Sequence, residues 1–220
     1  LHLAREPGVS ENTRLLAGRC LIGLQGYNHR VYCSVLISEA SHTSLSITAE
    51  AIKALGPETF GRDYLAAFFR VCANLYPSHK DRLERTIGTR YFVQRLINGL
   101  DVAIIEWLLD DLTKDLTCKC GKECYECDCL NGMSKIIGLM LDRHFELATP
   151  PFDPKRIWQW VGNLNYHESK RANQSKAVKV LQDDDGLRQG IIAYAFEKLT
   201  DPDHIFETKQ YKFNWYSHSG

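Results

Sequence analysis

Apolar residues recur at intervals of three and four along most of this chain of 220 residues. That period places them on one face of a helix, which can then pack against a core. The pattern predicts helices at residues 11–24, 44–55, 101–115, 173–182 and 186–199. Four further helices are predicted to begin at Pro57, after Ser78, at Ser134 and at Pro154.

Capping residues and breakers support these segments. Ser10 is a natural N-cap for the first helix, and Asp153 followed by Pro154 is a typical helix start. Residues 29–39 are ambiguous, because Val31, Val35 and Ile37 also suit a short strand, but their surroundings favour a helix.

The predicted fold is therefore all-α. Helix pairs recur at a loose spacing of about 40 residues, near that of two-helix solenoid repeats. No repeated motif accompanies the spacing, so two architectures stay open: an irregular solenoid-like helical repeat, or an irregular helical bundle. Either one would carry an inserted cysteine-rich zinc knuckle.

Composition narrows the class of protein. Hydrophobic residues make up 44%, enough for a core, and 27 Lys and Arg balance 27 Asp and Glu. Zero net charge argues against a protein whose main role is to bind the phosphate backbone of nucleic acids, because such proteins usually carry an excess of basic residues. No secretory signal and no apolar run of membrane-spanning length is present.

Three scattered cysteines, Cys20, Cys33 and Cys72, lie in apolar stretches and are predicted to be buried as small hydrophobes. Free core thiols and the missing signal point to a reducing, cytoplasmic setting. Because the chain begins with Leu1 and stops at Gly220 without a closing element, we interpret it as a fragment of a longer multidomain protein.

The other five cysteines are gathered within twelve residues, at positions Cys118, Cys120, Cys124, Cys127 and Cys129. Short Cys-x-Cys and Cys-x-x-Cys steps let one loop surround a Zn²⁺ with four thiolates. The simplest tetrad is the first four, with Cys129 replacing one of them as the alternative. Four thiolates leave no open coordination position, so the predicted zinc is structural rather than catalytic. Disulfides, redox thiols or unliganded cysteines are the other interpretations, and the spacing matches neither ferredoxin pattern well.

The best basic stretch runs over residues 170–179. Its cations Lys170, Arg171, Lys176 and Lys179 could meet phosphates, although a solvated helix face balanced by Asp183–Asp185 is the plainer interpretation. Trp158 and Trp160 could stack on bases, but their helical spacing favours the core.

Catalytic signatures are missing. The chain has no phosphate-binding Gly-x4-Gly-Lys-[Ser/Thr] loop, no dinucleotide fingerprint and no nucleophile elbow, and His167-Glu168 lacks the second histidine of a zincin. His144 is more simply a satisfied or exposed histidine than a metal ligand, and Asp201, Asp203 and His204 suit a turn and cap. An enzyme within this fragment is therefore not favoured, and no catalytic residue is assigned.

Residues 118–164 carry a resemblance to a known family. The order of helical pairs, cysteine knuckle, Asn-Gly-Met-Ser-Lys-Ile-Ile-Gly and Trp-Gln-Trp-Val resembles the all-α regions that follow the ATPase core in bacterial STAND (NACHT-like) NTPases. That resemblance implies helical repeats that sense a partner or hold an ATPase closed. The ATPase motifs are absent here, so no family residue carries over.

These observations predict N-terminal helical pairs over residues 1–116, a metal knuckle over 117–130 and a C-terminal helical part over 131–220. The expected function is a protein-interaction or sensor scaffold that binds a protein partner or a neighbouring domain, with no membrane contact. The alternative is a nucleic-acid-binding module that uses the knuckle and the Lys170–Lys179 segment.

Overall fold

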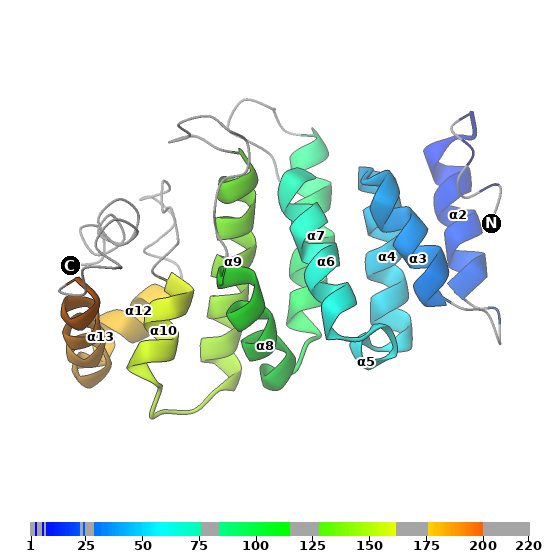
Figure 1. Cartoon of the computed structure of the whole chain (residues 1–220). Helices are drawn as coiled ribbons and strands as arrows, with labels where there is room; N and C mark the ends of the chain where they lie inside the picture. The colour runs from blue at the N-terminus through cyan, green and yellow to red at the C-terminus, as the bar shows by residue number, and fades with distance from the viewer. Residues whose placement is uncertain are drawn as a thin grey trace. The chain divides into compact units, whose positions relative to one another are not determined.

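The computed structural model describes residues 3, 6, 8–22, 24, 29–75, 84–114, 128–161 and 176–199. Every regular element in those ranges is a helix (Figure 1), which confirms the predicted all-α class. No helix among them is long and apolar enough to cross a membrane. The chain divides into two compact units, residues 1–100 and 101–220. Each unit is described by itself.

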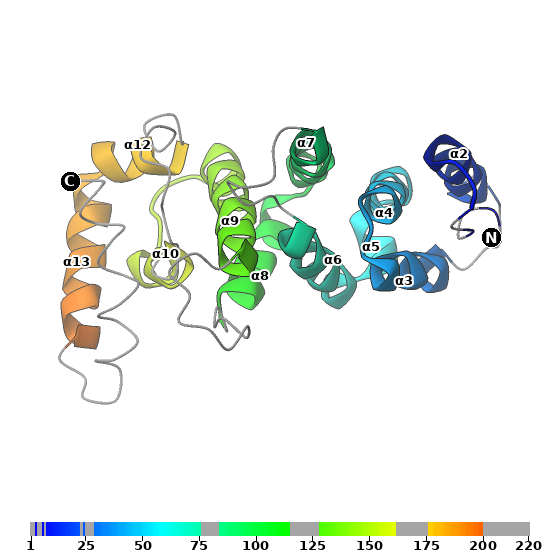
Figure 2. The same cartoon turned by 90° about the horizontal axis from the view of Figure 1, so that it is seen from above.

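Unit 1 is built around one central helix. Its elements are α2 (Glu11–Ile22), α3 (His29–Glu39), α4 (His42–Leu55), α5 (Pro57–Phe60), α6 (Arg62–Leu75) and α7 (Glu84–Asn98). Helix α4 packs against α2, α3 and α7, and α6 packs against α3 and α7. Helices α3 and α6 lie on one side of the unit, with α4 and α7 on the other (Figure 2). Within unit 1 the helices are thus stacked as two pairs, α3 with α4 and α6 with α7.

The ends of α4 are set by local sequence. Ser41 and Ser44 form a reciprocal capping box. The Ser44 backbone N–H donates to Oγ of Ser41 at 3.1 Å, and the Ser41 backbone N–H donates to Oγ of Ser44 at 3.0 Å. Gly56 stops the helix because its φ of 86° suits glycine, and Pro57 then begins α5. Between these ends α4 buries an apolar stripe that includes Leu45, Ile47 and Ile52. The ambiguous segment 29–39 is the helix α3, with Cys33 and Leu36 fully buried.

Helix α2 approaches α4 closely at Gly18. A Cβ built there would lie 2.6 Å from Cγ2 of Ile47, too near for any larger residue without movement. The N-cap is Ser10 as predicted, because its hydroxyl accepts from the Thr13 backbone N–H at 3.3 Å. The prediction that Cys20 is buried is wrong. Helix α2 turns Gly18 toward α4, and two residues later the helix has turned Cys20 to solvent.

Unit 2 comprises α8 (Val102–Thr113), α9 (Asp128–Leu147), α10 (Pro154–Val161), α12 (Lys176–Asp183) and α13 (Asp185–Leu199). Helix α8 packs against α9 and α10, α9 against α12, and α13 against both α10 and α12. Helix α9 begins at Asp128, before the predicted start at Ser134, and Met133 is the first of its apolar residues described as buried. Trp158 and Trp160 are 3% and 1% exposed, which confirms the core interpretation over base stacking.

The predicted division at residues 116 and 130 stays a prediction. Residues 115–127 lie outside the described part of the chain, and the compact units meet in sequence between Leu100 and Asp101.

Candidate functional site

The predicted zinc knuckle falls largely outside the described residues. Cys118, Cys120, Cys124 and Cys127 are not among them, and of Cys129 only the helical backbone at the start of α9 is described. Within the described ranges, no group of three or more His, Cys, Asp or Glu side chains could hold a metal ion. The zinc site therefore stays a prediction.

Half of the predicted basic segment is described. Lys176 and Lys179 are exposed on α12, while Ala177, Val178 and Leu181 on its other face are buried. The Ala177 backbone N–H donates to Oδ1 of Asp142 at 3.0 Å, which fixes the start of α12 against α9. Lys170, Arg171, His167, Asp201, Asp203 and His204 lie outside the described residues. The plain interpretation, a solvated helix face, accounts for both described lysines.

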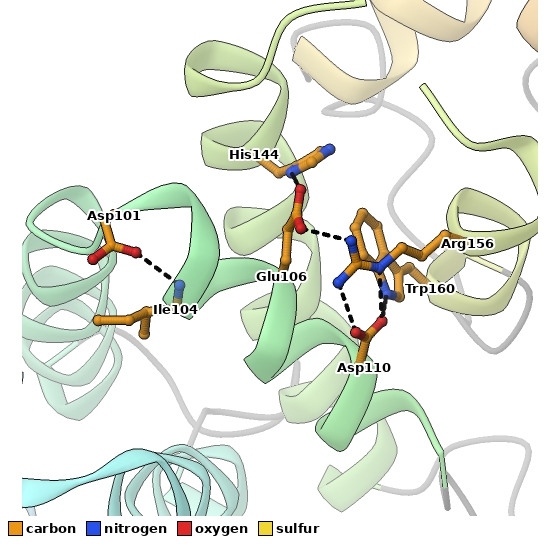
Figure 3. Close-up of polar contacts among 7 residues, drawn as sticks. All are labelled: Asp101, Ile104, Glu106, Asp110, His144, Arg156 and Trp160. Carbon is orange, nitrogen blue, oxygen red and sulfur yellow. Dashed lines mark hydrogen bonds and ion pairs between the residues drawn. The ribbon is translucent and has the colours of Figure 1, made fainter. Parts of the chain in front are cut away.

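A charged network joins α8 and α10 (Figure 3). Glu106 and Asp110 stand one turn apart on α8, and Arg156 and Trp160 one turn apart on α10, so each pair shares a helix face. The Arg156 guanidinium donates to both Asp110 oxygens, from Nε to Oδ1 at 3.2 Å and from Nη2 to Oδ2 at 2.7 Å. Its Nη1 donates to Oε2 of Glu106 at 2.6 Å. The Trp160 indole Nε1 donates to Oδ1 of Asp110 at 2.8 Å.

This geometry favours the charged forms of both partners. Burial by itself would raise the pKa of Asp110, but hydrogen bonds from Arg156 and Trp160 and the nearby positive charge outweigh it and lower the pKa below its ordinary value. The hydrogen bond to Asp110 and the two carboxylate charges raise the pKa of Arg156 in turn. At neutral pH the network therefore consists of one cation held by two carboxylates.

His144 of α9 borders this network. It is 4% exposed, and its ring meets the Trp160 ring edge-on at a centroid distance of 4.9 Å, with Phe145 and Phe152 nearby. Its Nδ1 lies 3.6 Å from Oε1 of Glu106, beyond hydrogen-bond distance. Burial lowers the pKa of His144; the negative charge of Glu106 opposes this shift and the positive charge of Arg156 adds to it. His144 is thus a core histidine, neither exposed nor fully satisfied, because its buried Nδ1 has no hydrogen-bond partner among the described residues.

The network links two helices, since Arg156 of α10 donates to carboxylates of α8. All three donating nitrogens of Arg156 are directed at carboxylates of α8, and the guanidinium also stacks on the Trp160 ring, with Cζ 5.0 Å from the ring centroid. Three of the five N–H donors of Arg156 are therefore held by carboxylates of α8. The network holds α10 against α8 and places His144 beside it.

Unit 1 carries a different feature, a groove between α4 and α7 with a volume of about 220 Å³. Buried Ala49, Phe92 and Leu96 line its base. Its other lining residues, in chain order, are His42, Ser46, Glu50, Lys53, Tyr91 and Arg95. From α4 the lining residues are spaced four, three, one and three positions apart, so one face of that helix forms a wall of the groove.

The rim of this groove on α7 is aromatic and cationic. Tyr91 is 60% exposed although it is a large aromatic residue. The guanidinium of Arg95, one turn further along, lies over the Tyr91 ring at 5.3 Å, and its Nη1 donates to the phenol oxygen at 3.4 Å. Across the groove, His42 meets the Phe92 ring edge-on at 5.6 Å. The arrangement offers an open aromatic surface beside positive charge.

Neither feature was assigned from the sequence. Tyr91 and Phe92 are adjacent aromatic residues that point about 100° apart on a helix, and it is the structure that shows Phe92 buried and Tyr91 exposed. Glu106 with Asp110 and Arg156 with Trp160 are visible as pairs at a spacing of four. Nothing local indicates that the two pairs meet across about 50 residues of chain.

Comparison of the sequence and structure with known proteins found no match. No protein-family model, no curated protein and no solved structure matches this chain. Functional inference therefore rests on the side chains themselves.

Proposed function

We propose that this chain is a protein-interaction scaffold of a larger multidomain protein. The observation that carries the proposal is the groove between α4 and α7, where exposed Tyr91 stands beside a buried apolar base. Exposed aromatic residues over an apolar hollow are typical of surfaces that bind proteins. The groove is also smaller than the roughly 300–1,000 Å³ clefts that hold small-molecule ligands and cofactors. A side chain of a partner protein suits it better than a nucleotide does.

Two further features support a scaffold. The helices of unit 1 are stacked as pairs, and we propose that such pairs continue as a solenoid, an architecture that presents extended binding surfaces. In unit 2 the Arg156 network holds α10 against α8. The resemblance of residues 118–164 to the helical regions of STAND NTPases supports a sensor role, with a neighbouring domain as one partner.

A structural zinc is part of this proposal. Four thiolates among Cys118, Cys120, Cys124, Cys127 and Cys129 would close the loop between α8 and α9. A zinc ion with four thiolate ligands is structural, because it has no open coordination position for catalysis.

Selection from a random peptide display library on the full chain tests the scaffold function. We expect selected peptides to lose binding to Tyr91→Ala and to keep binding to Phe196→Ala. Phe196 is a matched control, because it is a helical aromatic residue with 63% exposure and lies outside the groove. If the selected peptides bind Tyr91→Ala and Phe196→Ala equally well, the groove is not the interaction site.

Nucleic-acid binding is the alternative, favoured by the exposure of both Lys176 and Lys179. This alternative predicts binding that weakens steeply as the salt concentration rises, because each phosphate contact releases counterions. Titration with single- and double-stranded DNA and RNA at low and moderate salt separates the two. Salt-sensitive binding that is lost when Lys170, Arg171, Lys176 and Lys179 are neutralised together would replace the scaffold proposal.

A further inference from the structure

We propose that the groove between α4 and α7 binds an acidic peptide segment that inserts one apolar side chain between two cations of the rim. This inference rests on the proposed scaffold function and adds the chemistry of the partner. The occupant is a segment of another protein with an aliphatic or aromatic residue flanked by glutamate or aspartate.

The shape of the groove argues for a single inserted side chain. Its base is apolar and its volume of about 220 Å³ is enough for one leucine or phenylalanine. The base residues Phe92 and Leu96 are 7% and 4% exposed, so they are already fixed by the core of unit 1. A rigid apolar hollow binds an anchor residue without having to be ordered first, which favours affinity.

The charges of the lining argue for an acidic flank. Lys53 on α4 and Arg95 on α7 line the groove, against one carboxylate, Glu50. Both cations are exposed, so neither is buried in a neutralising pair, and the charged residues of α7 between Thr89 and Asn98 are Arg90 and Arg95. A carboxylate of the partner gains charge-assisted hydrogen bonds from Arg95, whose planar guanidinium is already oriented by Tyr91.

Glu50 offers a test of the charge of the partner peptide. It lies one turn before Lys53 on the same wall of the groove. An acidic partner is repelled by Glu50 and attracted by Lys53, whereas a basic partner experiences the reverse. Two nearly isosteric substitutions, Glu50→Gln and Lys53→Gln, therefore move affinity in opposite directions for one class of peptide.

The experiment is a fluorescence-polarisation titration of the full chain with four short synthetic peptides. The first has one leucine between two glutamates. The second replaces the glutamates by glutamines, the third replaces them by lysines, and the fourth replaces the leucine by serine. For the first peptide we expect Lys53→Gln and Arg95→Gln each to weaken binding about threefold, and Glu50→Gln to tighten it about twofold, magnitudes typical of exposed charge pairs.

Three controls separate contact from folding. Arg90→Gln removes the same charge from the same helix outside the groove and should leave affinity within about a factor of 1.5. Arg95→Lys keeps the positive charge without the planar guanidinium and should restore part of the affinity that Arg95→Gln loses. Thermal unfolding of every variant confirms that unit 1 remains folded.

The outcomes distinguish this inference from the proposed function. Tightest binding of the glutamate peptide, with opposite effects of Glu50→Gln and Lys53→Gln, supports both. Preference for the lysine or glutamine peptide, still lost in Tyr91→Ala, overturns the acidic partner and keeps the scaffold function. If none of the four peptides binds while display-selected peptides need Tyr91, the acidic inference fails alone. If no peptide from either source depends on Tyr91, both fail.

Discussion

The two units place different polar groups inside their cores. In the described part of unit 1 the buried polar side chains are neutral, with Thr48 and Cys33 fully buried and Tyr64 beside them. Unit 2 instead buries His144 beside a partly exposed network in which Arg156 is paired with Glu106 and Asp110. Unit 1 therefore depends on groups that must stay uncharged, whereas unit 2 combines an uncharged histidine with an adjoining ion network that must stay charged.

This difference gives the units opposite responses to pH. Burial raises the pKa of the Cys33 thiol to about 11, and the nearby hydroxyls of Tyr64 and Thr48 reduce the shift only in part. Burial also raises the pKa of Tyr64 and of Cys72. A raised pKa leaves unit 1 fully stable below the ordinary thiol range and weakens it as pH rises toward 11. The lowered pKa values of His144 and Asp110 make unit 2 sensitive to acid.

The sequence supplies a separate probe for each unit. All four tryptophans, Trp107, Trp158, Trp160 and Trp215, lie in residues 101–220. Tryptophan fluorescence therefore reports on unit 2. Buried Cys33 and Cys72 report on unit 1, because a thiol reagent reaches them only when that unit opens, and peptide mapping separates them from the other cysteines.

Metal removal is expected to have the largest effect. We expect about one Zn²⁺ per chain by elemental analysis, and structural zinc contributes on the order of 10 kcal/mol in zinc-finger peptides. Chelation or Cys124→Ser should speed hydrogen exchange across residues 110–145 and leave Cys33 and Cys72 protected. Cys20→Ser is the control, because Cys20 is exposed and lies outside the cluster. Protein purified without chelator under reducing conditions and found free of metal would contradict the zinc prediction.

Cavities in the two cores test whether the units unfold separately. Trp160→Ala removes a fully buried ring and its hydrogen bond to Asp110, and should destabilise unit 2 by about 3–5 kcal/mol. Phe68→Ala makes a similar cavity in unit 1. In urea titrations, the first should shift the fluorescence transition and the second the thiol-protection transition. Equal shifts of both transitions in either variant would show that the two units unfold as one.

The charged network should be worth less than a buried ring. Arg156→Met leaves two carboxylates facing each other, and because these groups are about one third exposed, the cost should be about 2 kcal/mol, between surface and buried pairs. Arg143→Met is the matched control: its ion pair with Glu146 at 3.0 Å lies on the surface of α9 and should contribute about 0.5 kcal/mol or less. Equal losses of stability in Arg156→Met and Arg143→Met would mean that the network does not hold α10 against α8.

Acid should weaken unit 2 before unit 1. Since the pKa of His144 is lowered, the unfolded chain binds a proton that the folded chain resists, and stability falls as pH drops below the ordinary histidine value near 6.5. The slope for one proton cannot exceed about 1.4 kcal/mol per pH unit. His144→Phe keeps a ring in the aromatic cluster and should flatten the fluorescence-detected stability between about pH 5 and 7. An unchanged slope in that variant would assign the acid response to another group.

The smallest expected effects come from two glycines at helix contacts. Gly18→Ala drives a methyl group against Ile47 in unit 1, and Gly190→Ala drives one to 2.6 Å from the Pro154 ring in unit 2. Overpacking costs about 1–3 kcal/mol, and alanine returns up to about 1 kcal/mol of helix propensity, so each variant should lose about 1 kcal/mol. Gly99→Ala, with 3.4 Å to its nearest neighbour, is the control. A gain in thermal stability for Gly18→Ala would show that α2 can move away from α4.

Sequence alone determined that the described segments are helical and marked several of their ends, although α9 begins before Ser134 and the helix predicted from Pro57 is divided at Gly61 into α5 and α6. Periodic apolar residues predicted the helical segments, and Ser10, Asp153 and the break at Gly56–Pro57 marked boundaries that the structure confirms, because helix formation and capping depend on neighbours within four residues. Tertiary structure decided the rest. It turned Cys20 outward, chose helix for residues 29–39, exposed Tyr91 rather than Phe92, and brought Arg156 to Asp110. Each of these depends on which helix face meets a partner 20 to 50 residues away, and burial and charge pairing across that distance leave no trace in the local pattern.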